Sequence, residues 1–167
     1  LPLALIRQGA LAGNLQWLQG FAKDHGVGLA PHGKTTMSPE LFAMQLAAGA
    51  WGITFATVFQ LGVGVAAGVR RAIIANQVLS AADLAGLTAL RQQHPDLQVW
   101  FLVDSLAQLR CIEQWFAKQS SAIPFDVLLE IGVPGKRTGC RSHTEALVLA
   151  QALAQSPAVR FGGIECY

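Results

Sequence analysis

Residues 52–76 read GITFATVFQLGVGVAAGVRRAIIAN. They begin with a short apolar run at 52–56, continue in a helical pattern at 58–67 that ends before Gly68, and close on a second apolar run at 72–75. Glycine directly after a helix is a common end signal, because it adopts positive φ without steric cost. A strand, a helix and a second strand in this order predict two parallel strands joined by a right-handed crossover.

The same alternation continues on both sides of this unit. Further apolar runs of strand length occur at 27–31, 99–103, 127–131 and 159–164. Helical patterns lie at 10–25, 38–48, 80–93, 106–119 and 144–155. The strand runs are continuously apolar, which is typical of parallel sheets covered on both faces. The pattern predicts an α/β fold with six parallel strands, either an open doubly wound sheet or a partial (β/α)8 TIM barrel with about six of eight strands.

The composition excludes several classes of protein. The chain has 167 residues, of which 52% are hydrophobic and 13% charged, and its net charge is +2. This amount of apolar material excludes a disordered chain, and the length suits one domain. A net charge near zero, with basic residues that are scattered rather than clustered, argues against a nucleic-acid partner.

The cysteines and the longest uncharged segment indicate the cellular compartment and whether the chain crosses a membrane. Cys111, Cys140 and Cys166 are odd in number and lack metal-ligand spacing, so we expect small hydrophobic side chains in a reducing, cytoplasmic compartment. Residues 43–69 carry no charge and have the length of a membrane span. Five glycines and several Thr and Gln residues interrupt them, so we predict buried elements and no membrane partner.

Polar residues follow the predicted strands at their carboxyl ends. They include His32, Lys34, Gln77, Asp104 and the loop 132–139. In both candidate architectures the chemistry lies at these strand ends. The contrast between apolar strands and polar strand ends therefore predicts a functional site there.

Lys34 lies in a segment that matches a nucleotide-binding pattern. Residues 28–35, Gly-Leu-Ala-Pro-His-Gly-Lys-Thr, fit the P-loop signature, and residues 99–104 resemble a Walker B strand ending in Asp. The context differs, because a P-loop follows a buried strand and opens directly into a helix. Here a polar helix end precedes Gly28, and the helix start signal falls later, at 38–39. A P-loop NTPase therefore remains an alternative only.

The other interpretation places Lys34 at the mouth of a barrel, after the first strand. A lysine that is partly desolvated there can act as a neutral amine and form a Schiff base. The residues alone are also compatible with an ordinary solvated loop lysine.

Two segments resemble a known enzyme family. Residues 29–39, Leu-Ala-Pro-His-Gly-Lys-Thr-Thr-Met-Ser-Pro, and 45–54, Gln-Leu-Ala-Ala-Gly-Ala-Trp-Gly-Ile-Thr, resemble the lysine segment of fold-type III pyridoxal-phosphate (PLP) enzymes. The similarity is to the D-threonine aldolase and D-serine dehydratase group, often described as amino acid deaminases, which has an alanine racemase N-terminal-type barrel. Residues 74–77, 103–105 and 130–140 agree with that group in the same order.

The resemblance implies roles for particular residues. Lys34 matches the lysine that forms the Schiff base with PLP. Arg137 matches the arginine near the phenolic oxygen of the cofactor, so the implied catalytic residues are Lys34 and Arg137. The implied cofactor-binding residues are these two together with Tyr167, His32 and Gln77. No metal ligand is implied within this chain; the ligands of a divalent metal in the full-length protein lie beyond it.

The resemblance also implies a function and a domain organisation. Residues 1–167 would form an N-terminal PLP-binding barrel domain, truncated before the last barrel strands and a β-rich domain, and inactive alone. The full-length protein, as a homodimer, would be a PLP-dependent lyase for a small-molecule D-3-hydroxy amino acid, similar to D-serine dehydratase (deaminase). The alternatives are a D-threonine aldolase, which cleaves the Cα–Cβ bond, and a non-catalytic PLP-binding homeostasis protein.

Overall fold

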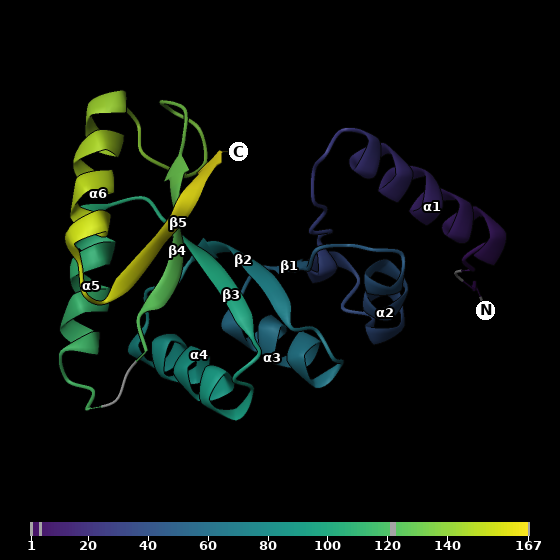
Figure 1. The fold of residues 1–167 in the computed structure, drawn as a ribbon, viewed down its shortest axis with the longest axis horizontal. Helices are drawn as coiled ribbons and strands as arrows, with labels where there is room; N and C mark the ends of the chain where they lie inside the picture. Colours follow the sequence, from purple (N-terminus) through teal and green to yellow (C-terminus); the bar gives the residue numbers. More distant parts are fainter. Residues whose placement is uncertain (1, 4, 121–122, 167) are drawn as a thin grey trace.

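A computed structural model describes residues 2–3, 5–120 and 123–166 (Figure 1). In this part of the chain the strands are β1 (Ile53–Phe55), β2 (Arg71–Gln77), β3 (Gln98–Val103), β4 (Phe125–Ile131) and β5 (Val159–Cys166). The helices are α1 (Gln8–Asp24), α2 (Pro39–Ala47), α3 (Val58–Ala66), α4 (Ala81–Gln93), α5 (Leu106–Phe116) and α6 (His143–Gln155). A short 3-10 turn, η1 (Gly33–Thr35), precedes α2.

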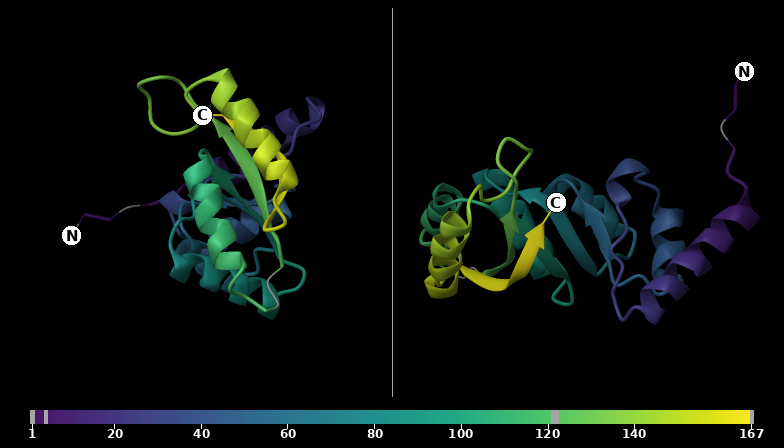
Figure 2. Two further views of the ribbon diagram at one scale, coloured as in Figure 1. Left: turned by 90° about the vertical axis from the view of Figure 1, so that its left-hand side faces the viewer. Right: turned by 90° about the horizontal axis from the view of Figure 1, so that it is seen from above.

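The described strands form one parallel sheet in the order β1-β2-β3-β4-β5. Because each right-handed crossover leads to the next strand in line, every crossover helix lies on the same face of the sheet. Figures 1 and 2 show α3 to α6 following the twist of the strands on that face. The sequential order confirms the partial barrel and excludes a doubly wound sheet, in which the strand order reverses.

The first predicted strand, 27–31, was wrong as a strand. These residues run beside β1, and Leu29 and Pro31 accept hydrogen bonds from the backbone N–H groups of Trp51 (2.7 Å) and Thr54 (2.8 Å). Among the described residues, the β-bridge beside this segment is an isolated one, between His32 and Thr54 of β1. Pro31 has no N–H to donate, so it cannot complete a ladder. The described sheet therefore has five strands rather than six.

The main core lies between the sheet and its helices. Phe55, Ile74 and Phe101 are fully buried there. Phe55 packs edge to face against Phe42 of α2, with 5.5 Å between the ring centroids.

The prediction that both faces of every strand are covered does not hold for β5. Phe161 and Ile164 on this edge strand are 37% and 65% exposed, because no described element packs over them.

Local start and end signals behave as predicted. Ser38 caps α2 by accepting a hydrogen bond from the Leu41 N–H (3.4 Å), and Pro39 occupies the first helical turn. Gly49 and Gly68 follow α2 and α3 with φ of 108° and 94°, where a side chain would be strained. Residues 43–69 thus divide into separate elements, and no helix among the described residues is long and apolar enough to span a membrane.

The cysteines differ from one another. Cys140 is buried, and burial raises the pKa of its thiol, with a further contribution from nearby Asp104. Cys111 and Cys166 are exposed, so the expectation of buried hydrophobic cysteines holds for Cys140 only.

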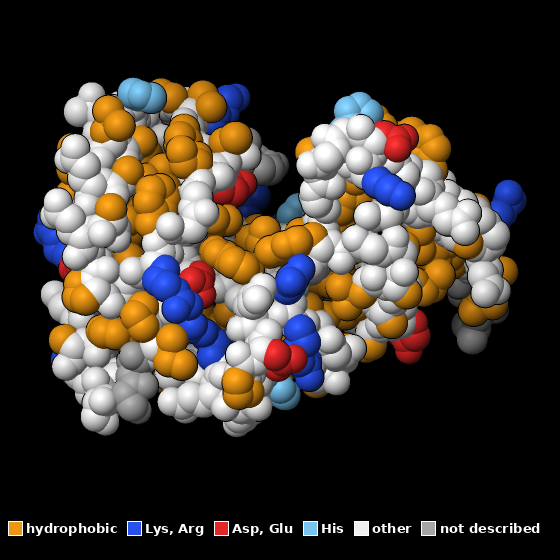
Figure 3. Space-filling view, viewed as in Figure 1, with side chains coloured by type: hydrophobic (Ala, Val, Ile, Leu, Met, Phe, Trp, Pro, Cys, Tyr) orange, Lys and Arg blue, Asp and Glu red, His pale blue; other side chains and the backbone are white. Residues whose placement is uncertain are grey.

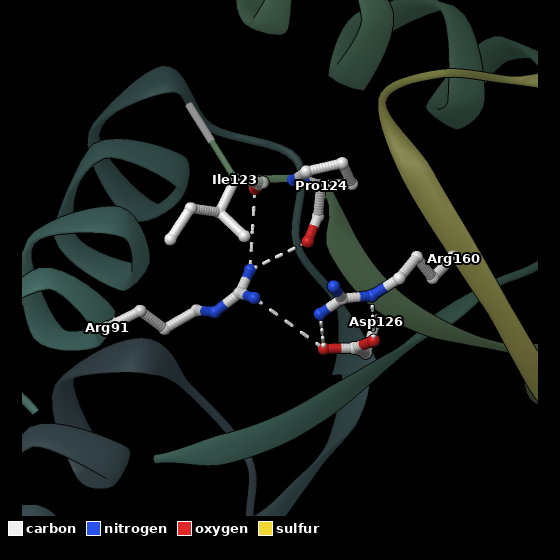
Figure 4. A network of polar contacts seen from close by, with 5 residues as sticks. All are labelled: Arg91, Ile123, Pro124, Asp126 and Arg160. Carbon is white, nitrogen blue, oxygen red and sulfur yellow. Dashed lines mark hydrogen bonds and ion pairs between the residues drawn. The ribbon is translucent and has the colours of Figure 1, made fainter. Parts of the chain in front are cut away.

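An ionic network closes the amino-terminal ends of β4 and β5 (Figure 4). Arg160 pairs with both carboxylate oxygens of Asp126 at 2.7 and 2.8 Å. Arg91 reaches the same carboxylate at 3.7 Å and donates to the carbonyl of Pro124 at 2.8 Å. The hydrogen bond to Asp126 raises the pKa of Arg160, whereas burial lowers that of Arg91. In a barrel this end stabilises the fold, and the opposite end carries the chemistry.

Candidate active site

A tight turn presents Lys34 at the carboxyl end of the sheet. A Cβ on Gly33 would lie 2.6 Å from Ile53 and 2.7 Å from Phe42, so only glycine lets the backbone pack this closely against the core. Met37, whose N–H donates to the Gly33 carbonyl at 2.9 Å, has a φ of 47° and turns the chain into α2. The position of Lys34 is thus set by backbone packing on both sides.

Lys34 opens onto a cavity of about 200 Å³. Its side chain is half-buried and makes no hydrogen bond or ion pair with the described residues. His32, Gln77 and Arg137, the other predicted site residues in the described part of the chain, line the same cavity. The remaining lining residues are Ala75, Asn76, Leu102, Glu130, Thr138 and Glu165. Tyr167 lies outside the described residues.

The cavity lies where the strands end. Figure 3 shows the molecule hollowed at this end, between the part with α5 and α6 and the part with α1 and α2, with charged side chains around the hollow. His32 and Lys34 come from the segment before α2, Gln77 from the end of β2, and Arg137 from the loop after β4. The structure therefore brings together residues that lie far apart in the sequence.

Glu130 was not among the predicted site residues. It is 2% exposed at the end of β4. It accepts hydrogen bonds from the Thr138 hydroxyl and from the Gln77 amide, the latter at 2.5 Å. Gln77 also donates to Asp104, at 3.0 Å. A charged residue within the otherwise apolar run 127–131 is the sequence signal that points to it, because carboxylates are seldom buried without partners.

Glu165 is a second carboxyl group that was not among the predicted site residues, although it directly follows the apolar run 159–164. It pairs in register with Glu130, and its Oε2 atom is buried with no hydrogen-bond partner among the described residues. Burial raises the pKa of Glu165, and the neighbouring Glu130 raises it further. A carboxyl group with a raised pKa retains its proton more readily and can donate it to a hydrogen-bond acceptor.

The surroundings of Lys34 differ from those of a P-loop. The residues before Gly28 are the end of α1 and a turn at Gly26, where φ is 65°. The helix that follows Lys34 begins only at Pro39. A P-loop places a strand before its glycines and the N-terminus of an α-helix at its lysine. Among the described residues, no strand precedes Gly28 and no α-helix begins at Lys34.

The residues present fit the cofactor that the resemblance implies. PLP carries an aldehyde, which requires a primary amine, and a phenolic oxygen, which favours a cation. Lys34 supplies an amine without a competing partner among the described residues, and Arg137 supplies a guanidinium at the same cavity. The unpartnered Glu165 oxygen leaves a further polar atom in the cavity lining.

Comparisons with known proteins agree with the fold. Residues 6–167 match the family described as "Alanine racemase, N-terminal domain". D-Threonine aldolase of an Arthrobacter species is 32% identical over 166 residues, which cover 99% of this chain and 42% of that protein. D-threo-3-Hydroxyaspartate dehydratase of Delftia sp. (strain HT23) is 32% identical over 164 residues, covering 98% and 42%. The crystal structure of D-threonine aldolase from Filomicrobium marinum superimposes with a TM-score of 0.85 at 30% identity, covering 96% of this chain and 42% of that one.

The chain therefore spans less than half the length of these relatives. The family match covers almost all of it, and the sequential parallel sheet agrees with that match. This chain belongs to the alanine racemase N-terminal domain family.

Proposed function

We propose that this chain is the N-terminal barrel part of a PLP-dependent lyase that acts on D-3-hydroxy amino acids. The observation that carries the proposal is the single cavity lined by both Lys34 and Arg137. The activities named for the relatives from Arthrobacter and Delftia support the substrate class, since both concern D-3-hydroxy amino acids.

The residues of this chain would act as follows. Lys34 would hold the cofactor through its amine, and its Nζ atom would be the base at the cavity that takes the α-proton of the substrate. Arg137 holds the phenolic oxygen of the cofactor. When bound, PLP acts as an electron sink for the reacting carbon. His32 and Gln77, and Tyr167 at the end of the chain, complete the proposed binding residues.

Within this class we place dehydration first. Loss of the α-proton and of the β-hydroxyl group from D-serine would release water and leave an enamine, and hydrolysis of its imine tautomer by water would give pyruvate and ammonia. The resemblance of residues 29–39 and 130–140 to the amino acid deaminase group supports this order. Retro-aldol cleavage, which converts D-threonine to glycine and acetaldehyde, is the alternative, and product analysis with both substrates separates the two reactions.

The test is a covalent label on the full-length protein. We expect visible absorbance from the bound cofactor, and after borohydride reduction we expect peptide mapping to place the label on Lys34. Lys34→Ala should abolish both absorbance and turnover, and Lys34→Arg should do the same, because a guanidinium stays protonated. Lys23→Ala, on the exposed part of α1, is the matched control and should change neither.

Two outcomes would contradict the proposal. A colourless full-length protein that binds ATP and magnesium would favour the P-loop alternative. A coloured protein that turns over none of the D-3-hydroxy amino acids would favour the PLP-binding homeostasis protein.

A further inference from the structure

The loop that carries Arg137 has a closed stem. The backbone N–H of Gly132 donates to the Cys140 carbonyl at 3.0 Å, and the N–H of Cys140 donates to the Glu130 carbonyl at 2.8 Å. Gly132 and Gly139 touch across the stem, so a Cβ on Gly132 would collide with the Thr138 carbonyl oxygen. Gly139 has a φ of 90°, which favours glycine on conformational grounds as well.

Side chains connect this loop to the ends of three strands. The Thr138 hydroxyl donates to Glu130 at the end of β4. The Gln77 amide at the end of β2 donates to both Glu130 (2.5 Å) and Asp104 (3.0 Å). Asp104, which follows β3, also accepts a hydrogen bond from the Gly139 N–H at 3.2 Å. The dipeptide Thr138–Gly139 is thus held by two carboxylates, which Gln77 joins.

The burial of Glu130 makes these bonds matter. A carboxylate that is 2% exposed is stable only while its oxygens keep their donors. Gln77 has two amide hydrogens, and its amide nitrogen lies within hydrogen-bond distance of both carboxylates. Moving Thr138 away would leave Glu130 Oε1 without the donor that the described structure gives it, so the network resists displacement of the loop.

From this geometry we propose that Thr138, Glu130 and Gln77 are positioning residues for Arg137. The inference rests on the proposed function, in which Arg137 contacts the cofactor. Thr138 follows Arg137 directly, so a fixed Thr138 fixes the backbone from which the guanidinium reaches the cavity. Misplacement of a binding group by about 1 Å can cost on the order of a hundredfold in rate, so the network would act through Arg137.

Thr138→Val tests this in the full-length protein. Valine keeps the shape of threonine and removes the hydroxyl donor, whereas Thr138→Ser restores the donor. Thr88→Val on α4 is a matched control, because the Thr88 hydroxyl is buried without a hydrogen-bond partner in the described structure. Gln77→Leu removes the donors from the opposite side of Glu130, in case Thr138→Val does not fold.

The first measurement is amide hydrogen exchange, which does not depend on the cofactor. Thr138→Val and Gln77→Leu should speed exchange in the peptide 132–140 by about tenfold, which corresponds to loss of one hydrogen bond to a charged group. Thr138→Ser and Thr88→Val should exchange like the wild type. Unchanged exchange in Thr138→Val would overturn the inference. A colourless wild-type protein would instead contradict the proposed function, so the two failures can be told apart.

The second measurement asks whether the effect passes through Arg137. Thr138→Val should weaken PLP binding about tenfold, measured by titration of the visible absorbance, and Thr138→Ser should rescue it. In an Arg137→Gln background the same change should add little, because interacting positions give non-additive effects. A fully additive double variant would mean that Thr138 acts independently of Arg137 and would reject the positioning role.

Discussion

At the scale of single residues, Glu165 and Glu40 show that the surroundings of a carboxyl group determine the direction in which its pKa shifts. The parallel register between β4 and β5 places it beside Glu130, and one of its oxygens is buried without a partner in the described structure. Burial and then repulsion from Glu130 raise the pKa of its carboxyl group. Glu40, at the exposed start of α2, is the opposite case. Hydrogen bonds from the backbone and from Ser38 lower the pKa of Glu40.

These opposite shifts predict opposite pH trends in stability. A group with a raised folded-state pKa stabilises the fold below its unfolded pKa, and that contribution is lost as the pH rises through the folded value. Wild type and Glu165→Gln should therefore unfold alike at acidic pH, and the glutamine variant should become the more stable one as the pH rises. Thermal unfolding from about pH 3 to about pH 8, a range that begins below the usual carboxyl pKa values and ends well above them, measures the difference.

Glu40→Gln is the control for this prediction. The folded-state pKa of Glu40 is lowered, so its contribution is present above the unfolded pKa and is lost as the pH falls. Glu40→Gln should therefore lose stability relative to wild type only towards neutral pH. The same trend in both variants would contradict a raised pKa for the carboxyl group of Glu165.

At the scale of elements, close packing of α3 on β1 holds the start of the sheet. A Cβ on Gly64 would overlap the Phe55 ring, which is fully buried. A Cβ on Gly62, in the same helix, would have no neighbouring atom within 4 Å. Gly64 therefore lets α3 pack closely against the Phe55 ring of β1, whereas Gly62 makes no such contact.

The two glycines predict opposite effects of the same substitution. Gly64→Ala should destabilise the protein by about 1–3 kcal/mol, because an overpacked core forces side chains from their preferred conformations. Gly62→Ala should stabilise it by about 0.5–1 kcal/mol, because alanine loses less backbone entropy in a helix. Urea unfolding of both variants measures the two changes, and a neutral Gly64→Ala would refute the close contact.

At the scale of the whole molecule, the described sheet is open at both edges. β5 has no neighbour on its outer side among the described strands, and the segment 27–32 forms one bridge with β1, between His32 and Thr54, rather than a ladder. Ile164 on β5 is 65% exposed, and Trp17 and Phe21 on α1 are 69% and 47% exposed.

A barrel of this type commonly takes its phosphate site from the loops after strands seven and eight. The chain spans 42% of its curated relatives, so we propose that such strands lie in the remainder of the full-length protein.

Cofactor retention tests this proposal. The 167-residue chain alone should lose PLP on dialysis, because the cofactor, without the loops that bind its phosphate group, would be held only through Lys34 and the cavity lining. The full-length protein should keep its visible absorbance under the same conditions. Equal retention by both proteins would show that residues 1–167 already contain the phosphate site.

The local pattern of the sequence determined most of the fold. Alternating apolar and helical segments, Ser38–Pro39 and the glycines after α2 and α3 act over a few residues, so they could be interpreted without knowing any distant contact. The sequence also predicted Lys34 at the carboxyl end of the sheet, although the segment 27–31 before it is not a strand. Among the predicted strands, the one at 27–31 was wrong, because the missing N–H of Pro31 outweighs the apolar character of its neighbours.

Only the tertiary structure decided which polar residues meet. Gln77 joins Glu130 to Asp104, and Thr138 donates to Glu130 directly. Gln77 lies at a register shift between β2 and β3 that no local pattern encodes. Glu165 becomes unusual only because β5 pairs in register beside Glu130. Secondary structure follows from interactions near in sequence, whereas the proton affinity of a carboxyl group depends on burial and on charges brought close by the fold.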